Sequence, residues 1–175
     1  MNGLWIHDAR TSRFADYAPT LLPQWDALWW MIGVQSGPID STWFYESEPN
    51  QAFFDDCHAF DLHGTVFDRV WRPSSIQILA PHLLVDEWSY FCGIEAPDVE
   101  SAERRVRHLD AAATLKSLLD GAEGRAEIVI IDVDDGLLFV FSPREDWLDV
   151  LAAQSKSAQR ISSPEDWQNW RGQGG

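Results

Sequence analysis

The sequence predicts a single α+β domain in which a mostly antiparallel sheet packs against three or four helices. Short aromatic and β-branched runs, separated by polar turns, predict a meander over residues 42–94 and a hairpin over residues 127–141. Helical patterns occur near residues 23–33, 98–120 and 143–153. Strands this closely spaced favour antiparallel pairing, because parallel neighbours need long crossovers. We expect residues 1–154 to form one domain, and residues 155–175 to be a polar connection and a short helix with a frayed Gly-rich end.

The N-terminal part predicts one strand and one helix. Residues 3–8 indicate a short strand with Leu4 and Ile6 on one face. The segment that follows Leu22 has apolar residues at three- and four-residue spacing. Pro23 suits the first turn of a helix and Gly33 suits its C-terminal cap. We therefore predict an amphipathic helix over residues 23–33.

The middle of the chain predicts the meander. The candidate strands are apolar or aromatic runs of four to twelve residues, and polar or Gly- and Pro-containing breaks separate them. They cover residues 42–46, 59–62, 66–71, 75–79 and 83–94.

Two helical regions are predicted in the C-terminal half. Apolar spacing indicates helix over residues 98–120, as one long helix or as two short ones with Asp110 starting the second. Ser142 fits an N-cap, Pro143 fits the first helical position and Glu145 completes a capping box. These signals predict a helix over residues 143–153. The same signal recurs as Ser-Pro-Glu-Asp-Trp from residue 163.

The run EIVIIDVDDGLLFVFSP, residues 127–143, admits two interpretations. Its Asp132-x-Asp134 resembles the nucleophile motif of haloacid-dehalogenase-like phosphatases, and that resemblance implies a nucleophile at Asp132 and a proton donor at Asp134. The family usually reads Asp-x-Asp-Gly-Thr, whereas here Asp135 precedes the glycine and Leu137 follows it. Asp-Gly between two apolar runs is a strong hairpin signal. We therefore predict a hairpin.

Charge and aromatic content narrow the classes of partner. The formal net charge is −15 at pH 7, and residues 14–103 carry fifteen acids and two bases, which is −13. Such a chain is a poor match for nucleic acid or an anionic membrane, and a basic partner suits it better. We expect most of the ten tryptophans in the core, because large aromatic side chains bury the most surface area there. The start of the chain lacks the pattern of a signal peptide, which predicts a cytoplasmic protein with reduced thiols.

The candidate partner-binding residues combine carboxylates with aromatic anchors. Acids steer association with a basic surface, and desolvated aromatics form hot spots. The candidates are Asp40, Trp43, Tyr45, Glu46, Glu48, Asp55, Asp56, Asp61, Asp86 and Glu87.

Catalytic, metal and cofactor sites are not predicted. Possible metal ligands, or a thiol–histidine pair, are scattered without the spacing that makes such sites recognisable. These residues are Cys57, His58, His63, His82, Asp86 and Cys92. The sequence therefore predicts a non-enzymatic acidic binding protein, such as a bacterial immunity protein that blocks the active site of a basic toxin or nuclease. The alternative is an enzyme or small-molecule-binding protein with a Trp-lined pocket that holds histidines and carboxylates.

Overall fold

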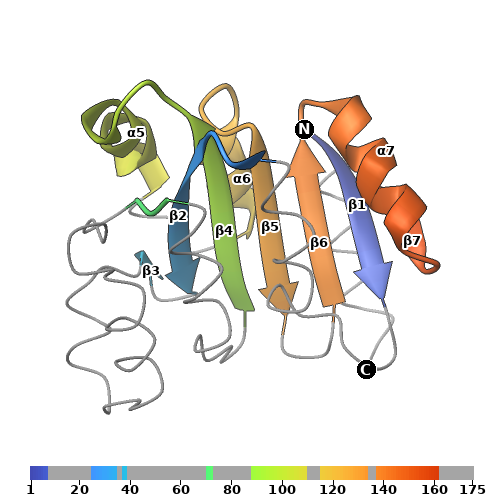
Figure 1. Cartoon of the computed structure of the whole chain (residues 1–175). Helices are drawn as coiled ribbons and strands as arrows, with labels where there is room; N and C mark the ends of the chain where they lie inside the picture. Colours follow the sequence, from blue (N-terminus) through green and yellow to red (C-terminus); the bar gives the residue numbers. More distant parts are fainter. Residues whose placement is uncertain are drawn as a thin grey trace, which may run out of the picture.

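The fold is an antiparallel sheet with helices packed on both faces, as seen in a computed structural model (Figure 1). The structure describes residues 1–7, 25–34, 37–38, 70–72, 88–109, 115–133 and 137–161. In this part of the chain the sheet has the order β3-β2-β4-β5-β6-β1-β7, and every neighbouring pair is antiparallel. The strands are β1 (Asn2–His7), β2 (Leu28–Val34), β3 (Gly37–Pro38), β4 (Trp88–Glu95), β5 (Ile128–Val133), β6 (Leu137–Ser142) and β7 (Ala158–Ile161). The predicted α+β class with a mostly antiparallel sheet is confirmed.

Two helices cover one face of the sheet. α5 (Val99–Val106) leads through the 3-10 turn η4 (Arg107–Leu109), and α6 (Leu115–Ala122) follows. Cross-strand pairing aligns Met31, Cys92, Val129 and Phe141 on this face. All four side chains belong to one buried cluster with the apolar residues of α5 and α6, which include Ala102. Burial of this apolar area is the main force that holds the two helices against the strands.

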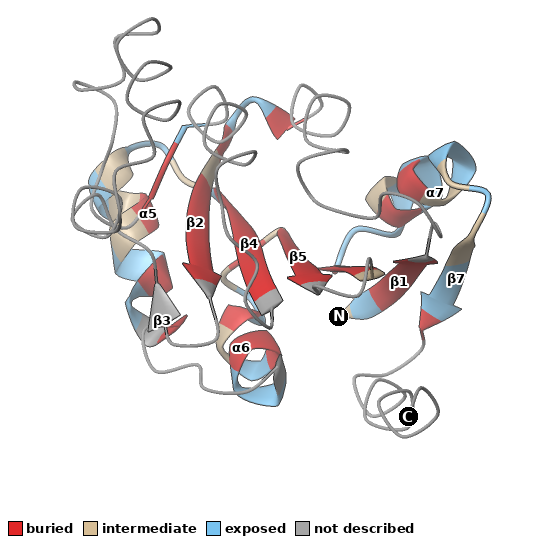
Figure 2. Ribbon diagram, turned by 90° about the horizontal axis from the view of Figure 1, so that it is seen from below, coloured by how far each residue is buried: buried red, intermediate tan, exposed pale blue. Residues whose placement is uncertain are grey.

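The third helix, α7 (Glu145–Gln154), lies on the opposite face, where it contacts β6, β1 and β7 (Figure 2). Leu4, Ile32, Phe91 and Val140 line this second face, and all are at most 2% exposed. The strands β2, β4 and β5 are coloured as buried over nearly all of their described length in Figure 2. The central strands are therefore buried on both faces.

The predicted hairpin and the predicted helix over residues 143–153 are both confirmed. β5 pairs with β6 from Val129 opposite Phe141 to Val133 opposite Leu137. Residues 134–136, which join these strands, lie outside the described residues. The predicted region 98–120 divides into α5 and α6, so the alternative with two short helices holds.

The predicted helix over residues 23–33 is wrong, because Leu28–Val34 forms strand β2. Trp30 and Ile32 are buried on one face of β2, and Met31 is buried on the other. A strand buried on both faces reads as a continuous apolar run, and such a run also satisfies helical spacing. Gly33 is therefore not a helix cap: it lies opposite Tyr90 in the sheet.

The capping prediction at Ser142 is also wrong, although the helix itself is present. Ser142 is the last residue of β6, and its hydroxyl donates to the Glu127 carbonyl oxygen at 2.7 Å. The same hydroxyl accepts the Arg144 backbone N–H at 2.9 Å. Arg144 is the N-cap of α7 and makes no side-chain capping bond. The Ser142 hydroxyl thus links the end of β6 to the residue before β5 and to the N-cap residue of α7, and it does not itself cap the helix.

Several predicted elements fall largely outside the described residues. This applies to the meander between residues 42 and 87, apart from residues 70–72, and to the second helix-start signal at residue 163. The end of the predicted meander is present as β4. Within the predicted polar connection, Ala158–Ile161 forms β7 and pairs with β1. In the described part of the chain, no helix has the length and apolar character needed to cross a membrane.

Candidate functional site

The ten predicted partner-binding residues all lie outside the described residues, so that surface stays a prediction. They are Asp40, Trp43, Tyr45, Glu46, Glu48, Asp55, Asp56, Asp61, Asp86 and Glu87. The same is true of Cys57, His58, His63 and His82, on which the alternative function depends. What the structure adds is the arrangement of aromatic and charged side chains around the sheet.

A tryptophan cluster fills the space between the sheet and α7. Trp25 precedes β2, and its ring lies 6.0 Å from the Trp30 ring and 5.5 Å from the Trp147 ring, tilted against both. Trp25 and Trp30 are buried, and Trp147 is partly buried. Tilted aromatic pairs at this distance add to the stability gained from burial. The cluster therefore belongs to the core, as the aromatic content predicts.

Backbone and cation–π contacts attach a further segment to this cluster. The backbones of Trp30 and Trp71 exchange two hydrogen bonds, at 2.8 and 2.7 Å. Arg72 lies 5.4 Å from the centre of the Trp29 ring, and the Trp29 indole N–H donates to the Ala96 carbonyl oxygen at 3.2 Å. Trp29 is partly exposed, so its ring forms part of the surface at the start of β2.

Strand topology gathers carboxylates at one end of the sheet. The starts of β2 and β5 and the ends of β4 and β6 lie together, at the upper end in Figure 1. Seven acids flank these strand ends or the first turns of α5 and α7, and one of them, Glu145, pairs with Arg160 on β7. We name the surface formed by the other six the acidic sheet end, and it consists of Asp26, Glu95, Asp98, Glu100, Glu127 and Asp146. Five of the six are exposed and Glu127 is partly buried.

Local contacts keep two of these carboxylates ionised. The Ser101 backbone N–H donates to Asp98 Oδ1 at 2.7 Å and lowers the pKa of Asp98. Arg144 bonds Asp146 through two nitrogens, at 3.0 and 2.8 Å, and this contact lowers the pKa of Asp146. The pKa of Arg144 is raised, first by this bond and further by the field of Glu127 and Glu95. Asp98 and Asp146 therefore stay ionised at neutral pH, and Arg144 is held by one of these two acids.

The outer side of α7 is electrostatically balanced. Arg160 on β7 pairs with Glu145 at 3.0 Å and also with Asp149. The Asn2 amide donates to the other oxygen of Glu145. These contacts connect α7 to β7 and β1, and they leave less net charge here than at the acidic sheet end.

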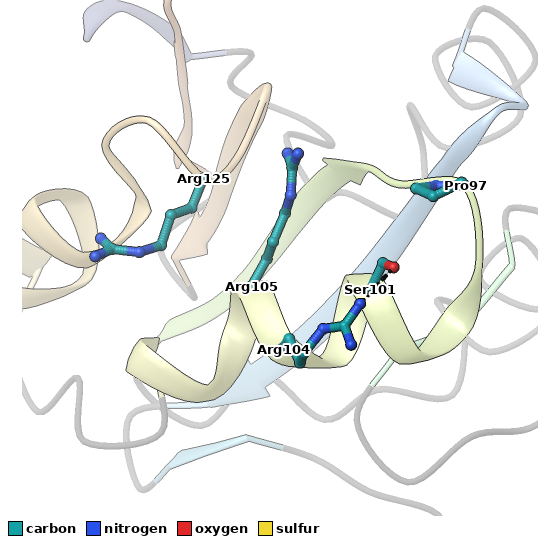
Figure 3. A pocket seen from close by; sticks show the side chains of 5 residues that line it. All are labelled: Pro97, Ser101, Arg104, Arg105 and Arg125. Atoms are coloured by element: carbon teal, nitrogen blue, oxygen red, sulfur yellow. Dashed lines mark hydrogen bonds between the residues drawn. The ribbon is translucent and has the colours of Figure 1, made fainter.

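A basic groove lies beside α5. It is lined by Pro97, Ser101, Arg104, Arg105 and Arg125 and has a volume of about 400 Å³ (Figure 3). Arg104 lies along the helix and donates to the Ser101 hydroxyl at 2.9 Å. Arg125 donates to the Gly121 carbonyl oxygen at 2.8 Å, and Arg105 extends into the space between the two. We name this feature the arginine groove, and it is not among the sites predicted from the sequence. The run Arg104-Arg105-Val106-Arg107, which has no acid within it, is the signal that could have revealed it.

Two potentially reactive side chains are buried. Asp132 is 3% exposed and lies opposite Ser89 and Leu138 in the sheet. Cys92 is fully buried, and burial raises the pKa of its thiol. In the described ranges, no three His, Cys, Asp or Glu side chains come together as a metal site would require. Asp132 is a strand residue within the fold, so the structure places it where the hairpin interpretation does.

Comparisons with protein-family models, with curated proteins and with solved structures find no match for this chain.

Proposed function

We propose that the protein is a non-enzymatic acidic binding protein of the bacterial cytoplasm, an immunity protein that neutralises a basic toxin or nuclease by covering its active site. The observation that carries the proposal is the concentration of negative charge: −13 of the net −15 falls within residues 14–103. A surface of this sign attracts a basic, nucleic-acid-handling partner and accelerates its association.

The acidic sheet end, which the structure describes, carries charge of the same sign. In the part of the chain that the structure describes, Arg144 bonds Asp146 and Arg104 interacts electrostatically with Asp98. Arg72 stacks on Trp29 and so has a local contact already. A basic partner could therefore meet Glu95 and Glu100, which make no ion pair within the described residues, whereas at Asp98 it would compete with Arg104.

Partly exposed aromatic surface supplies the second component of a binding face. Trp29 lies at the start of β2, whose first residue pairs with Glu95. A tryptophan anchor is typical of the centre of a protein interface, whereas charged residues on the rim contribute mainly to the association rate.

Affinity capture at increasing salt concentration tests the proposal. The immobilised protein is exposed to lysate of the source cell, and captured proteins are eluted with a salt gradient and identified. We expect a basic protein whose association rate falls at least about tenfold between low and high ionic strength. Its expression should be toxic, and co-expression of this chain should remove the toxicity.

Charge-neutralised variants locate the binding surface. Glu95→Gln combined with Asp98→Asn and Glu100→Gln removes three acids from the acidic sheet end. The matched control, Glu145→Gln combined with Asp149→Asn, removes acids that Arg160 already pairs. The first variant should slow association more per charge removed than the control. Capture of proteins without a basic surface, salt-insensitive association, or failure of the rescue would each contradict the proposal.

A further inference from the structure

The arginine groove carries an inference that does not depend on the proposed function, because its charge has the opposite sign. Its three arginines come from two parts of the chain, with Arg104 and Arg105 on α5 and Arg125 between α6 and β5. Arg107 follows directly in η4 and is exposed. Three arginines thus line one groove, in which Arg105 extends into the space and the Arg125 guanidinium group is turned toward Gly121 (Figure 3), while Arg107 lies outside the lining.

None of these four arginines pairs with a carboxylate of the described residues. Arg104 and Arg125 bond a hydroxyl and a carbonyl oxygen, respectively. Three other described bases do pair with a carboxylate: Lys116 with Asp120 at 2.6 Å, Arg144 with Asp146 and Arg160 with Glu145. The arginines that line the groove therefore differ from these three bases in having no carboxylate partner within the described part of the chain.

The sequence of α5 even offers two acidic partners that the structure does not use. Glu100 precedes Arg104 by four residues, and Glu103 precedes Arg107 by four. A glutamate four residues before a basic residue is the favourable order for an ion pair on a helix. Neither pair forms, and Arg104 turns instead to the Ser101 hydroxyl. The guanidinium groups consequently keep donors available for a ligand.

We propose that the arginine groove binds the phosphate group of a small phosphorylated molecule. A guanidinium group offers parallel N–H donors that match phosphate oxygens, and charge-assisted bonds of this kind are about twice as strong as neutral ones. The Ser101 hydroxyl accepts from Arg104 and so can donate its own proton to the anion. A volume of about 400 Å³ falls in the range of small-molecule sites.

The net charge favours a small anion over a polyanion. A nucleic acid or an acidic protein would extend beyond the groove and meet the surface of a chain with net charge −15. A single phosphate group interacts mainly with charges within the Debye length, about 10 Å at 0.1 M ionic strength. It meets the arginines there, together with the repulsion of Asp98 at the N-cap and of Glu100 and Glu103 on the same helix. A phosphate in direct contact with Arg105 and Arg104 gains more from these contacts than it loses to acids that it does not contact.

Pyrophosphate is the probe for this site. It is titrated into the full chain, with heat of binding and the arginine Nε–H signals in NMR spectra as readouts. We expect saturable binding in the millimolar range or tighter, with shifts of Arg104, Arg105 and Arg125 and none of Arg160. Inorganic phosphate should bind more weakly at the same site, and a nucleoside diphosphate at least as tightly as pyrophosphate.

A matched pair of variants separates a site from general charge. Arg105→Gln and Lys116→Gln each remove one positive charge from an exposed position, but Lys116 lies on α6 and pairs with Asp120. Arg105→Gln should weaken pyrophosphate binding about tenfold, and Lys116→Gln less than about twofold. Circular dichroism shows that each variant is folded before it is titrated.

Three results would overturn the proposal. The first is the absence of arginine shifts at saturating pyrophosphate, and the second is an equal loss of affinity in the two variants. The third is tighter binding of an oligonucleotide or a hexaglutamate peptide than of pyrophosphate, which would assign the groove to nucleic acid or to an acidic protein segment. The lysate capture of a basic protein is a separate measurement, so failure of either proposal leaves the other intact.

Discussion

Replacing Gly33 by alanine tests the packing of β2 against β4 most directly. A Cβ atom at Gly33 would lie 2.0 Å from Tyr90 Cζ, 2.2 Å from its hydroxyl oxygen and 2.4 Å from Cε1. Non-bonded carbon atoms attract best at about 3.5 to 4.0 Å, so the ring must move by more than about 1 Å. Tyr90 is fully buried within the cluster that includes Met31 and Cys92, and the ring has little space into which it can move.

Two opposing contributions determine how much Gly33→Ala destabilises the protein. Overpacking a core costs about 1 to 3 kcal/mol, and an overlap with three ring atoms belongs near the upper end of that range. Alanine recovers about 0.5 to 1 kcal/mol relative to glycine, because it restricts the unfolded chain. Gly33→Ala should therefore lower the free energy of unfolding by about 2 kcal/mol. In a Tyr90→Leu background the atoms that clash are absent, and the same substitution should be neutral or slightly stabilising.

A double-mutant cycle measures this coupling. Urea unfolding of the wild type, Gly33→Ala, Tyr90→Leu and the double variant should give an interaction energy of about 2 kcal/mol. Gly124→Ala is the control: its Cβ would meet no atom within 4 Å, but its φ of 69° disfavours alanine. It should cost the same in both backgrounds. A neutral Gly33→Ala, or an equal cost with and without the tyrosine ring, would refute the packing argument.

Three further predictions concern single side chains. Ser142→Ala removes the bond to the Glu127 carbonyl oxygen from a fully buried site, and it should lower the free energy of unfolding in urea by about 1 to 3 kcal/mol. A loss below about 0.5 kcal/mol would contradict this. In a Cys57→Ser variant, Cys92 should react with a thiol reagent only after unfolding, because burial raises its pKa and blocks access. Rapid labelling of the folded protein would show that the site is open. Asp98→Ala should lower the urea midpoint at pH 7, since Asp98 caps α5. The folded pKa of Asp98 is lowered, so its stabilisation is present above its unfolded pKa of about 3.9 and is lost as the pH falls through the folded pKa. The two proteins should therefore converge near pH 2, and a constant difference across the pH range would argue against the capping bond.

Local signals predict the hairpin and α7 because each rests on contacts close in sequence. Apolar runs on either side of Asp135-Gly136 need only one turn to pair, and β5 and β6 pair as expected. The helix after Pro143 forms although its predicted cap does not. The hydroxyl of Ser142 bonds Glu127 instead, and no pattern within six residues encodes that contact across the hairpin.

The incorrect prediction of a helix over residues 23–33, where the structure has β2, has a different cause. Trp29, Trp30, Met31 and Ile32 supply apolar side chains to both faces, and a helix and a doubly buried strand are then equally compatible with the spacing. Tertiary pairing with β4 decides between them, from Leu28 opposite Glu95 to Val34 opposite Ser89. The length of the run, seven residues in β2, is the signal that favours a strand, because helices usually extend further.

The acidic sheet end and the arginine groove likewise combine residues that are close in sequence with residues that only the fold brings together. The sequence places the excess of acid in the middle of the chain, but the acidic sheet end also includes Glu127 and Asp146 from the C-terminal half. They join Glu95 because β5 and β6 follow β4 in the sheet, and strand order is not encoded locally. The arginine groove is assembled in a similar way, since Arg125 lies far along the chain from Arg104 and Arg105.

Net charge alone does not describe every part of the surface of this protein. Arg144 and Arg160 are held by carboxylates on α7, whereas the arginines of α5 have no such partner among the described residues. Surface ion pairs of the first kind contribute little stability, and they cancel the charge that a ligand would meet. Unpaired arginines keep both their charge and their donors. An acidic protein can thus present a local cationic surface, and we expect the pairing of each base, together with the total of −15, to decide where an anion binds.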